Sequence, residues 1–181
     1  MFVAILDNIR SAYNVGSILR TADCAGIDAV VMAGCTAYPP HPKLPKTSLG
    51  AERSVPWLYV EDAFRFMANC RAGEFEPEAR CDWCDISGWD WASFKVAAFE
   101  IAPRAMDLFA YQWPLNVLGV FGNEVGGVNA DLLEAADQIV QIPMWGKKAS
   151  LNVASSFAVA AYEYRRVKMG KYPPAPPLQR G

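Results

Sequence analysis

Two polar segments in the last third of the chain hold the side chains best suited to chemistry. In the first, Asn123 and Glu124 follow an apolar run and precede the adjacent glycines Gly126 and Gly127. Adjacent glycines allow positive φ angles and let a ligand approach main-chain N–H and C=O groups closely. The second segment, 142–153, has the sequence Ile-Pro-Met-Trp-Gly followed after three residues by Ser-Leu-Asn-Val. Together they predict a ligand-binding site made from two loops.

The pattern around these segments predicts the elements that position them. A nearly continuous apolar run of strand length is typical of a strand covered on both faces. A strand, a glycine loop, a helix, a second strand, a polar loop and a long helix form a ligand crevice beyond the strand ends of an α/β protein. The expected elements are strands at 115–121 and 138–142 and helices at 130–136, capped by Asn129, and at 152–168.

The rest of the chain predicts a βαβ unit at the start and an irregular centre. Gly26 is expected to end the first helix, for which Ser11 or Asn14 is the N-cap. The unassigned Trp-rich segment 71–93 looks like an insertion that covers a flank or touches substrate. We expect strands at 2–6, 28–32 and 95–99, helices ending at Gly26 and spanning 60–70 and 105–111, and a loop at 34–56.

A third polar group stands at the first helix, where Asn14, Gly16 and Arg20 occur together. With Gly-Asn-Glu-x-x-Gly at 122–127 and the Ile-Pro-Met and Ser-Leu-Asn-Val runs, these residues resemble, in order, the three motifs of the SpoU (TrmH-like) RNA ribose 2′-O-methyltransferases of the SPOUT superfamily. The resemblance covers most of the chain except 71–93 and the proline-rich tail 171–181, which we expect to be disordered. It implies methylation of an RNA ribose 2′-OH with S-adenosylmethionine (SAM) as cofactor and without a metal.

The resemblance also implies an architecture that hydrophobic periodicity does not predict. The expected fold is a single α/β domain over residues 1–170, with a mostly parallel sheet and helices on both faces. Its C-terminal part, roughly 115–167, would form a trefoil knot, a feature that is otherwise nearly absent from proteins. The family further implies a homodimer with the first and last helices at the interface.

The site residues are carried over from the family position by position. We expect a cofactor pocket built mostly from main-chain groups of three loops, with Leu118, Ile142 and Leu151 flanking the adenine. The catalytic candidates are Arg20, Asn14, Glu124, Ser150 and Asn152. The cofactor-binding candidates are Leu118, Phe121, Gly122, Asn123, Glu124, Ile142, Pro143, Met144, Ser150, Leu151, Asn152 and Val153, and no metal ligand is expected.

The permanent charge of a guanidinium limits the roles that Arg20 can have in catalysis. A guanidinium has a pKa above about 12 and stays protonated, so it cannot serve as a general base. Our hypothesis is that Arg20 holds the target phosphate and stabilises negative charge developing at O2′, while Glu124 or the RNA phosphate takes the proton. Alternatives remain for each residue: Arg20 paired with Asp23, Glu124 capping nearby backbone, and Ser150 as a helix N-cap.

Charge is unusual for an RNA-binding protein. The net charge is −2 and the pI is about 5.4, so RNA contact must depend on local basic patches. Ordinary loop solvation is the alternative for the lysines and arginine concerned, and His41 is expected to be a turn residue. We expect tRNA rather than rRNA as substrate, because no appended domain is evident. The RNA-binding candidates are Lys43, Lys46, Arg53, Lys147 and Lys148.

Composition and motifs limit the other classes of protein to which the chain could belong. The five cysteines form no disulfide framework, and Cys81-x-x-Cys84 supplies only half of a zinc site. The longest apolar runs fall short of the roughly 20 residues of a membrane span, and we expect a cytoplasmic protein. Two other functions stay open: a catalytically silent knotted homodimer that binds RNA or SAM, and a nucleotide oxidoreductase. The missing G-x-G-x-x-G fingerprint disfavours the latter.

Overall fold

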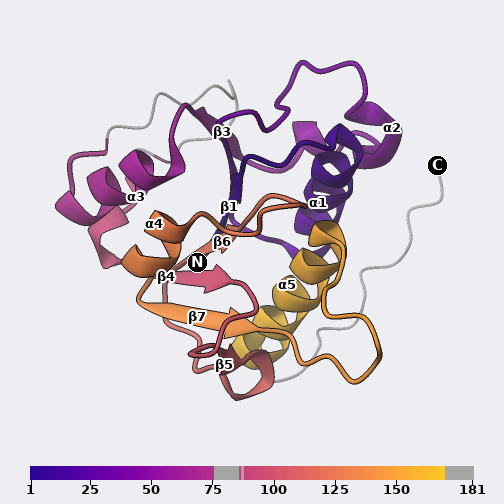
Figure 1. Ribbon diagram of the computed structural model, residues 1–181. Helices are drawn as coiled ribbons and strands as arrows, with labels where there is room; N and C mark the ends of the chain where they lie inside the picture. The colour runs from indigo at the N-terminus through magenta and orange to yellow at the C-terminus, as the bar shows by residue number, and fades with distance from the viewer. Residues whose placement is uncertain (76–85, 87, 170–181) are drawn as a thin grey trace.

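A seven-stranded parallel sheet organises the protein (Figure 1). The computed structural model describes residues 1–75, 86 and 88–169. Every strand pair within these ranges is parallel, in the order β3-β2-β1-β6-β4-β7-β5. The strands are β1 (Phe2–Asp7), β2 (Ala29–Ala33), β3 (Trp57–Val60), β4 (Lys95–Phe99), β5 (Met106–Asp107), β6 (Val117–Phe121) and β7 (Gln138–Gln141).

Side chains of each central strand alternate between two hydrophobic cores, one on each face of the sheet. In β1, Phe2 and Leu6 belong to one core, and Val3 and Ile5 belong to the other. All four are fully buried. This explains why the central strands are continuous apolar runs, because a strand covered on both faces has no solvent side.

Helices cover both faces, as predicted. Figure 1 shows α1 (Ala12–Ala25) and α5 (Val153–Met169) side by side on one face, with α2 (Pro45–Ser48) beside α1. On the other face lie α3 (Ala63–Ala72) and α4 (Ala130–Ala135). The α/β class and the parallel sheet of the sequence prediction are thus confirmed.

Side-chain caps fix where four of the helices begin, among them α3, where Asp62 accepts from Arg65 N. Ser11 accepts a hydrogen bond from Asn14 N at the start of α1, and Asn129 accepts one from Asp131 N at α4. At α5 the cap is Asn152, which accepts from Ala154 N at 2.9 Å. Asn152 rather than Ser150 therefore caps this helix, and the prediction that Gly26 ends α1 is also correct.

Three local predictions were wrong. Strand β3 lies between the predicted loop 34–56 and the predicted helix 60–70, because four residues are too few to show a period. The predicted helix 105–111 is instead strand β5 followed by the 3₁₀ turn η3 (Leu108–Ala110), since edge pairing with β7 overrides weak helical propensity. The spacing of Ala63, Phe64 and Met67 predicts a shared apolar face on the helix at 60–70, but Phe66 faces the core there and Phe64 is 45% exposed.

The Trp-rich segment is partly described and packs against the α3 side of the sheet. Trp91 packs between Phe66 and Phe94, at ring-centroid distances of 5.8 and 5.4 Å. Cys81, Cys84 and the tail 171–181 lie outside the described residues. Within the described ranges no cluster of potential metal ligands occurs, and no helix there has the length and apolarity to cross a membrane.

Candidate active site

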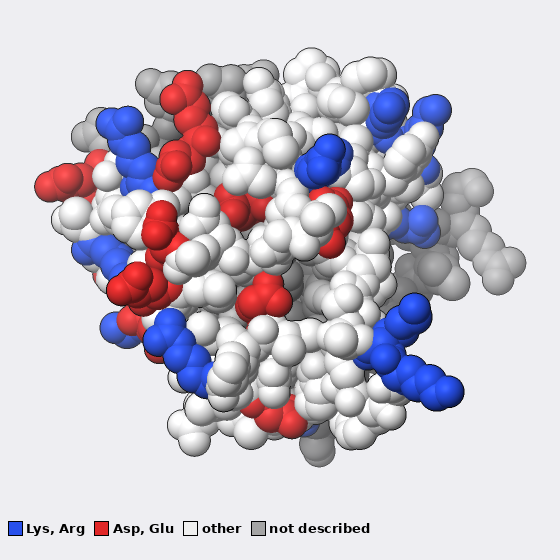
Figure 2. Space-filling model, in the orientation of Figure 1, with Lys and Arg blue, Asp and Glu red and all other residues white. Residues whose placement is uncertain are grey.

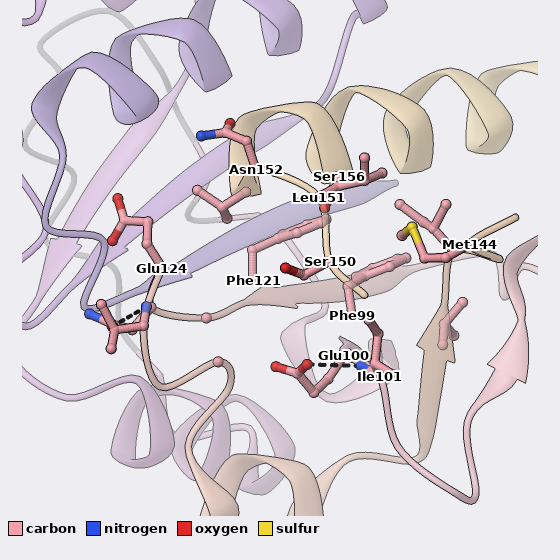
Figure 3. A pocket seen from close by; sticks show the side chains of 17 residues that line it. Phe99, Glu100, Ile101, Phe121, Glu124, Met144, Ser150, Leu151, Asn152 and Ser156 are labelled. Carbon is pink, nitrogen blue, oxygen red and sulfur yellow. Dashed lines mark hydrogen bonds between the residues drawn. The ribbon is translucent and has the colours of Figure 1, made fainter. Parts of the chain in front are cut away.

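A cavity of about 460 Å³ opens beyond the carboxyl ends of β4, β6 and β7, next to the start of α5 (Figure 3). Its side chains come from three loops that are distant in sequence and converge here. This is where a parallel α/β sheet binds its ligands. The lining residues are Phe99, Glu100, Ile101, Phe121, Gly122, Asn123, Glu124, Val125, Gly127, Val140, Ile142, Met144, Ser150, Leu151, Asn152, Val153 and Ser156.

The glycine loop after β6 is a tight, internally bonded turn. Asn123 and Gly127 exchange backbone hydrogen bonds of 2.9 Å in both directions. The Asn123 side chain accepts from Val125 N and Gly126 N and donates to Asn8 O. At Gly122 a Cβ atom would lie only 2.2 Å from the Gly127 carbonyl carbon and from Val128 N. Glycine is therefore required at 122 by the close approach of two backbone segments.

Glu124 joins this loop to the start of α1. Its carboxylate accepts hydrogen bonds from Arg10 N at 3.0 Å, from Ser11 N at 3.1 Å and from Asn14 Nδ2 at 2.9 Å. Asn152 Nδ2 in turn donates to Asn14 Oδ1 at 3.1 Å. Residues from all three predicted motifs are thus linked by one chain of hydrogen bonds at the rim of the cavity.

We expect the stability that Glu124 contributes to disappear in acid. Burial by itself raises the pKa of Glu124, but the hydrogen bonds from Arg10, Asn14 and Ser11 outweigh it and hold the pKa below its ordinary value of 4.5. The contribution is therefore complete above pH 4.5 and is lost as the pH falls through the lower folded-state pKa. Urea unfolding of the unaltered protein and Glu124→Gln should give a difference in unfolding free energy at pH 7 that shrinks near pH 3. An equal difference at both pH values would contradict this.

The electrostatic character of the cavity is anionic. Two carboxylates, Glu100 and Glu124, are among its lining residues, and no lysine or arginine of the described part of the chain is. Glu100 accepts from Val128 N at 2.9 Å and from Ile101 N at 2.8 Å, which fixes the carboxylate at the cavity wall. Such a site favours a ligand that carries positive charge.

Sequence reasoning missed the wall formed after β4, namely Phe99, Glu100 and Ile101. A signal was present, because a glutamate directly follows an apolar strand at the edge where the other loops were expected. Nothing in the local pattern of 95–101, however, places β4 between β6 and β7. That order is set by the crossover topology.

The structure gathers most of the predicted cofactor-binding residues in this cavity. All of them line it except Leu118 and Pro143. Leu118 is 1% exposed and belongs to the core under α3 and α4. Its side chain is therefore on the opposite face of β6 from Phe121, which does line the cavity.

Among the catalytic candidates, Arg20 stands apart. Asn14, Glu124 and Asn152 form the hydrogen-bonded chain, and Ser150 lines the cavity. Arg20 is exposed on α1 and is not among the residues that line its own chain's cavity. The alternative partner Asp23 accepts instead from Ser54 Oγ at 2.6 Å, so the described residues contain no Arg20–Asp23 ion pair.

The basic candidates lie on the same side of the molecule as α1. Figure 2 shows basic side chains over α2 and over the loop between β7 and α5, whereas the α3 and α4 side carries most of the acidic ones. Lys46 is on α2, Arg53 follows it in the 3₁₀ turn η1 (Ala51–Arg53), and both are exposed. The loop before α5 presents Lys147 and Lys148. An acidic net charge therefore coexists with a basic side.

Comparison with known proteins identifies the family of the chain. A family model described as the SpoU rRNA Methylase family matches residues 1–80 and 86–162. The 23S rRNA (guanosine-2′-O-)-methyltransferase RlmB of Bordetella pertussis is 32% identical over 166 residues, which cover 92% of this chain and 60% of that protein. The 23S rRNA (guanosine(2553)-2′-O)-methyltransferase RlmP of Bacillus subtilis is 28% identical over 163 residues, covering 90% of this chain and 57% of that protein.

The fold is shared with a solved structure from the same family. The SpoU methyltransferase AviRb from Streptomyces viridochromogenes, in complex with AdoMet, superposes with a TM-score of 0.75 at 24% identity, over 94% of this chain and 58% of that one. The chain thus spans about 60% of the length of the curated relatives it matches. Because the family model matches residues 1–80 and 86–162, which are most of the chain, the chain belongs to the SpoU rRNA Methylase family.

Proposed function

We propose that this protein is a SAM-dependent RNA ribose 2′-O-methyltransferase. The observation that carries the proposal is the convergence of three separated segments on one cavity, with Asn14, Glu124 and Asn152 bonded at its rim. When bound, SAM supplies a methyl group on a cationic sulfonium. The cavity suits it in size, in its apolar walls at Phe99 and Phe121, and in its two carboxylates.

Glu124 acts in this proposal as a positioning residue rather than a base. Its two oxygens already accept three N–H bonds, and its pKa is lowered, so it has little tendency to take a proton. It fixes Asn14 and the start of α1 at the cavity rim. The proton of the ribose 2′-OH is then released to solvent water as the O2′–methyl bond forms and the methyl–sulfur bond breaks, and Arg20 stabilises the developing charge on O2′.

A homodimer explains the position of Arg20. Because this side chain is exposed and lies off its own chain's cavity, a second copy packed against α1 and α5 would bring the guanidinium to the neighbouring site. The C-terminal trefoil knot belongs to the same proposal. Its support is family membership and the crossover order of β6, β4 and β7.

Mixing two inactive variants tests this arrangement. We expect Arg20→Ala and Glu124→Gln each to be nearly inactive, and their mixed dimers to contain one site with both residues intact. Random pairing in a two-fold dimer then restores roughly a quarter of the original activity. If Arg20 acts within its own chain, mixing restores nothing, and light scattering should report a dimer in either case.

The methyl acceptor is proposed to be ribosomal RNA. We expected tRNA from the sequence, whereas both relatives described above are 23S rRNA methyltransferases. Mapping 2′-O-methyl groups in total RNA from cells with and without this protein decides the question. A difference in tRNA alone would overturn the rRNA assignment.

Calorimetric titration with SAM and with NAD tests the cofactor. We expect SAM to bind and NAD not to bind. Methyl transfer from labelled SAM to RNA should be lost in Arg20→Lys, because lysine keeps the charge of arginine but not its planar fork. Binding of SAM without any transfer to RNA would favour the catalytically silent homodimer. Binding of NAD instead would contradict the proposal.

A further inference from the structure

A second cavity of about 630 Å³ adjoins the first along the carboxyl edge of the sheet. It lies beyond the ends of β1 and β2, whereas the first lies beyond β4, β6 and β7. Its walls are the start of α1 and the segment after β2. The lining residues are Arg10, Ser11, Ala12, Tyr13, Gly34, Cys35, Thr36, Ala37, Tyr38, Pro40, His41 and Lys43.

The two cavities share a wall. The backbone N–H groups of Arg10 and Ser11 donate to Glu124 in the first cavity, and the same two residues line the second. A molecule in the second cavity is therefore separated from a molecule in the first by residues 10 and 11 and by the Glu124 carboxylate that accepts from them.

The charges of the two cavities are opposite. Among the residues that the structure describes, the first is lined by two carboxylates and by no lysine or arginine, while the second is lined by Arg10 and Lys43 and by no carboxylate. Within the described ranges neither of these two cationic side chains makes a hydrogen bond or ion pair. Unpaired cations in a cleft attract an anionic ligand.

Aromatic rings line the same cleft, and hydrogen bonds of Thr36 fix the segment after β2 that forms one of its walls. Tyr13 is 47% exposed on the α1 side. On the other side Tyr38 packs on Tyr59 at a ring-centroid distance of 4.1 Å. Thr36 Oγ1 donates to Leu6 O and accepts from Ile9 N. An exposed tyrosine such as Tyr13 beside two cations is suited to a base and its phosphate, because every base presents a π-face for stacking.

We propose that the second cavity holds the methyl-acceptor nucleotide of the RNA, with its base against Tyr13 and its phosphate between Arg10 and Lys43. This places its ribose at the shared wall, beside Asn14 and Glu124 and within reach of the first cavity. The inference rests on the proposed function for the identity of the ligand. It adds a site, distinct from the loop lysines 147 and 148, that binds base and phosphate together.

The first test measures RNA binding, independently of methyl transfer. A fluorescent single-stranded RNA of mixed sequence is titrated with the full-length protein and its variants. We expect Tyr13→Ala to raise the Kd about tenfold, within the range of one lost base stack, and Tyr13→Phe to restore it. For the double variant Arg10→Ala and Lys43→Ala, the slope of log Kd against log salt should fall by roughly 0.7, as the loss of one neutralised phosphate on a single strand predicts.

Matched controls separate these effects from a general loss of exposed side chains. Two exposed residues serve as controls because they line neither cavity. Phe109 is a 51% exposed aromatic residue on η3, and Lys95 is an exposed lysine at the amino end of β4, whereas both cavities lie beyond the carboxyl ends of the strands. Phe109→Ala and Lys95→Ala should leave the Kd within twofold of the original. Thermal melts establish that each variant folds, and calorimetry should show an unchanged Kd for SAM in all of them.

Cross-linking provides the direct test. RNA that contains 4-thiouridine is irradiated with the protein, and cross-linked peptides are identified by mass spectrometry. We expect cross-links in residues 10–13 or 34–43. Cross-links confined to the loop before α5, or a Tyr13→Ala variant that changes the oligomeric state but not the RNA Kd, would overturn the nucleotide site. If methyl transfer is absent yet RNA binding depends on Tyr13, the proposed function fails while the nucleotide site stands.

Discussion

Gly122→Ala should destabilise the protein by about 2 to 3 kcal/mol and abolish measurable SAM binding. The added Cβ would lie 2.2 Å from the Gly127 carbonyl carbon and from Val128 N. These are backbone atoms, which cannot rotate away as the end of a side chain can, so the loop must open to relieve the overlap. For a chain of 181 residues we expect the melting temperature to fall by roughly 5 to 10 °C.

The same loop provides a matched control. A Cβ at Gly126 meets no atom within 4 Å, so Gly126→Ala adds the same methyl group four residues away without an overlap. We expect its melting temperature and its Kd for SAM to stay close to those of the unaltered protein. If both variants lose SAM binding equally, close approach of the backbone at 122 is not what the glycine provides.

The parallel sheet was predictable because its central strands are apolar on both faces. A run such as 117–121 permits no solvent-facing side, and helices on both faces follow from this. The two edge strands were less predictable, because β3 has four residues and β5 has two, which is too short to show a period. Pairing with β2 and β7 defines such short strands, and that information is not local.

The site was predictable to the extent that it depends on loops with unusual residues. Glycines, carboxamides and a carboxylate after apolar runs identified the 122–127 and 142–153 segments. Glu100 was not identified, because its importance depends on β4 being the neighbour of β6 and β7. Strand order is a property of the whole chain, and no period of 2 or 3.6 residues encodes it.

The second cavity could not be predicted from the local sequence pattern either. Tyr13 and Lys43 are thirty residues apart, in segments that read separately as a helix start and a loop. They line one cleft because β1 and β2 are adjacent and parallel, so their following segments meet at one edge. Charge counted over the whole chain, at −2, gave no indication of this local concentration of cations.

The last prediction concerns the Asn14–Glu124 pair, where removal of either partner should eliminate most of the activity. Asn14→Ala and Glu124→Gln should each lower kcat/KM for methyl transfer about 100-fold. In Glu124→Gln an amide NH₂ replaces one of the two oxygens that face three N–H donors, so at least one donor loses its acceptor. Because the two residues act as a unit, the double variant should lose little more than either single variant.

The matched control is Glu134→Gln, the same isosteric loss of charge at an exposed residue of α4 outside both cavities. It should leave kcat/KM unchanged. A double variant whose loss equals the product of the single losses would mean that Asn14 and Glu124 contribute separately. In that case the 2.9 Å hydrogen bond between them would be incidental to catalysis, and Glu124 could no longer be regarded as the residue that positions Asn14 at the rim of the cavity.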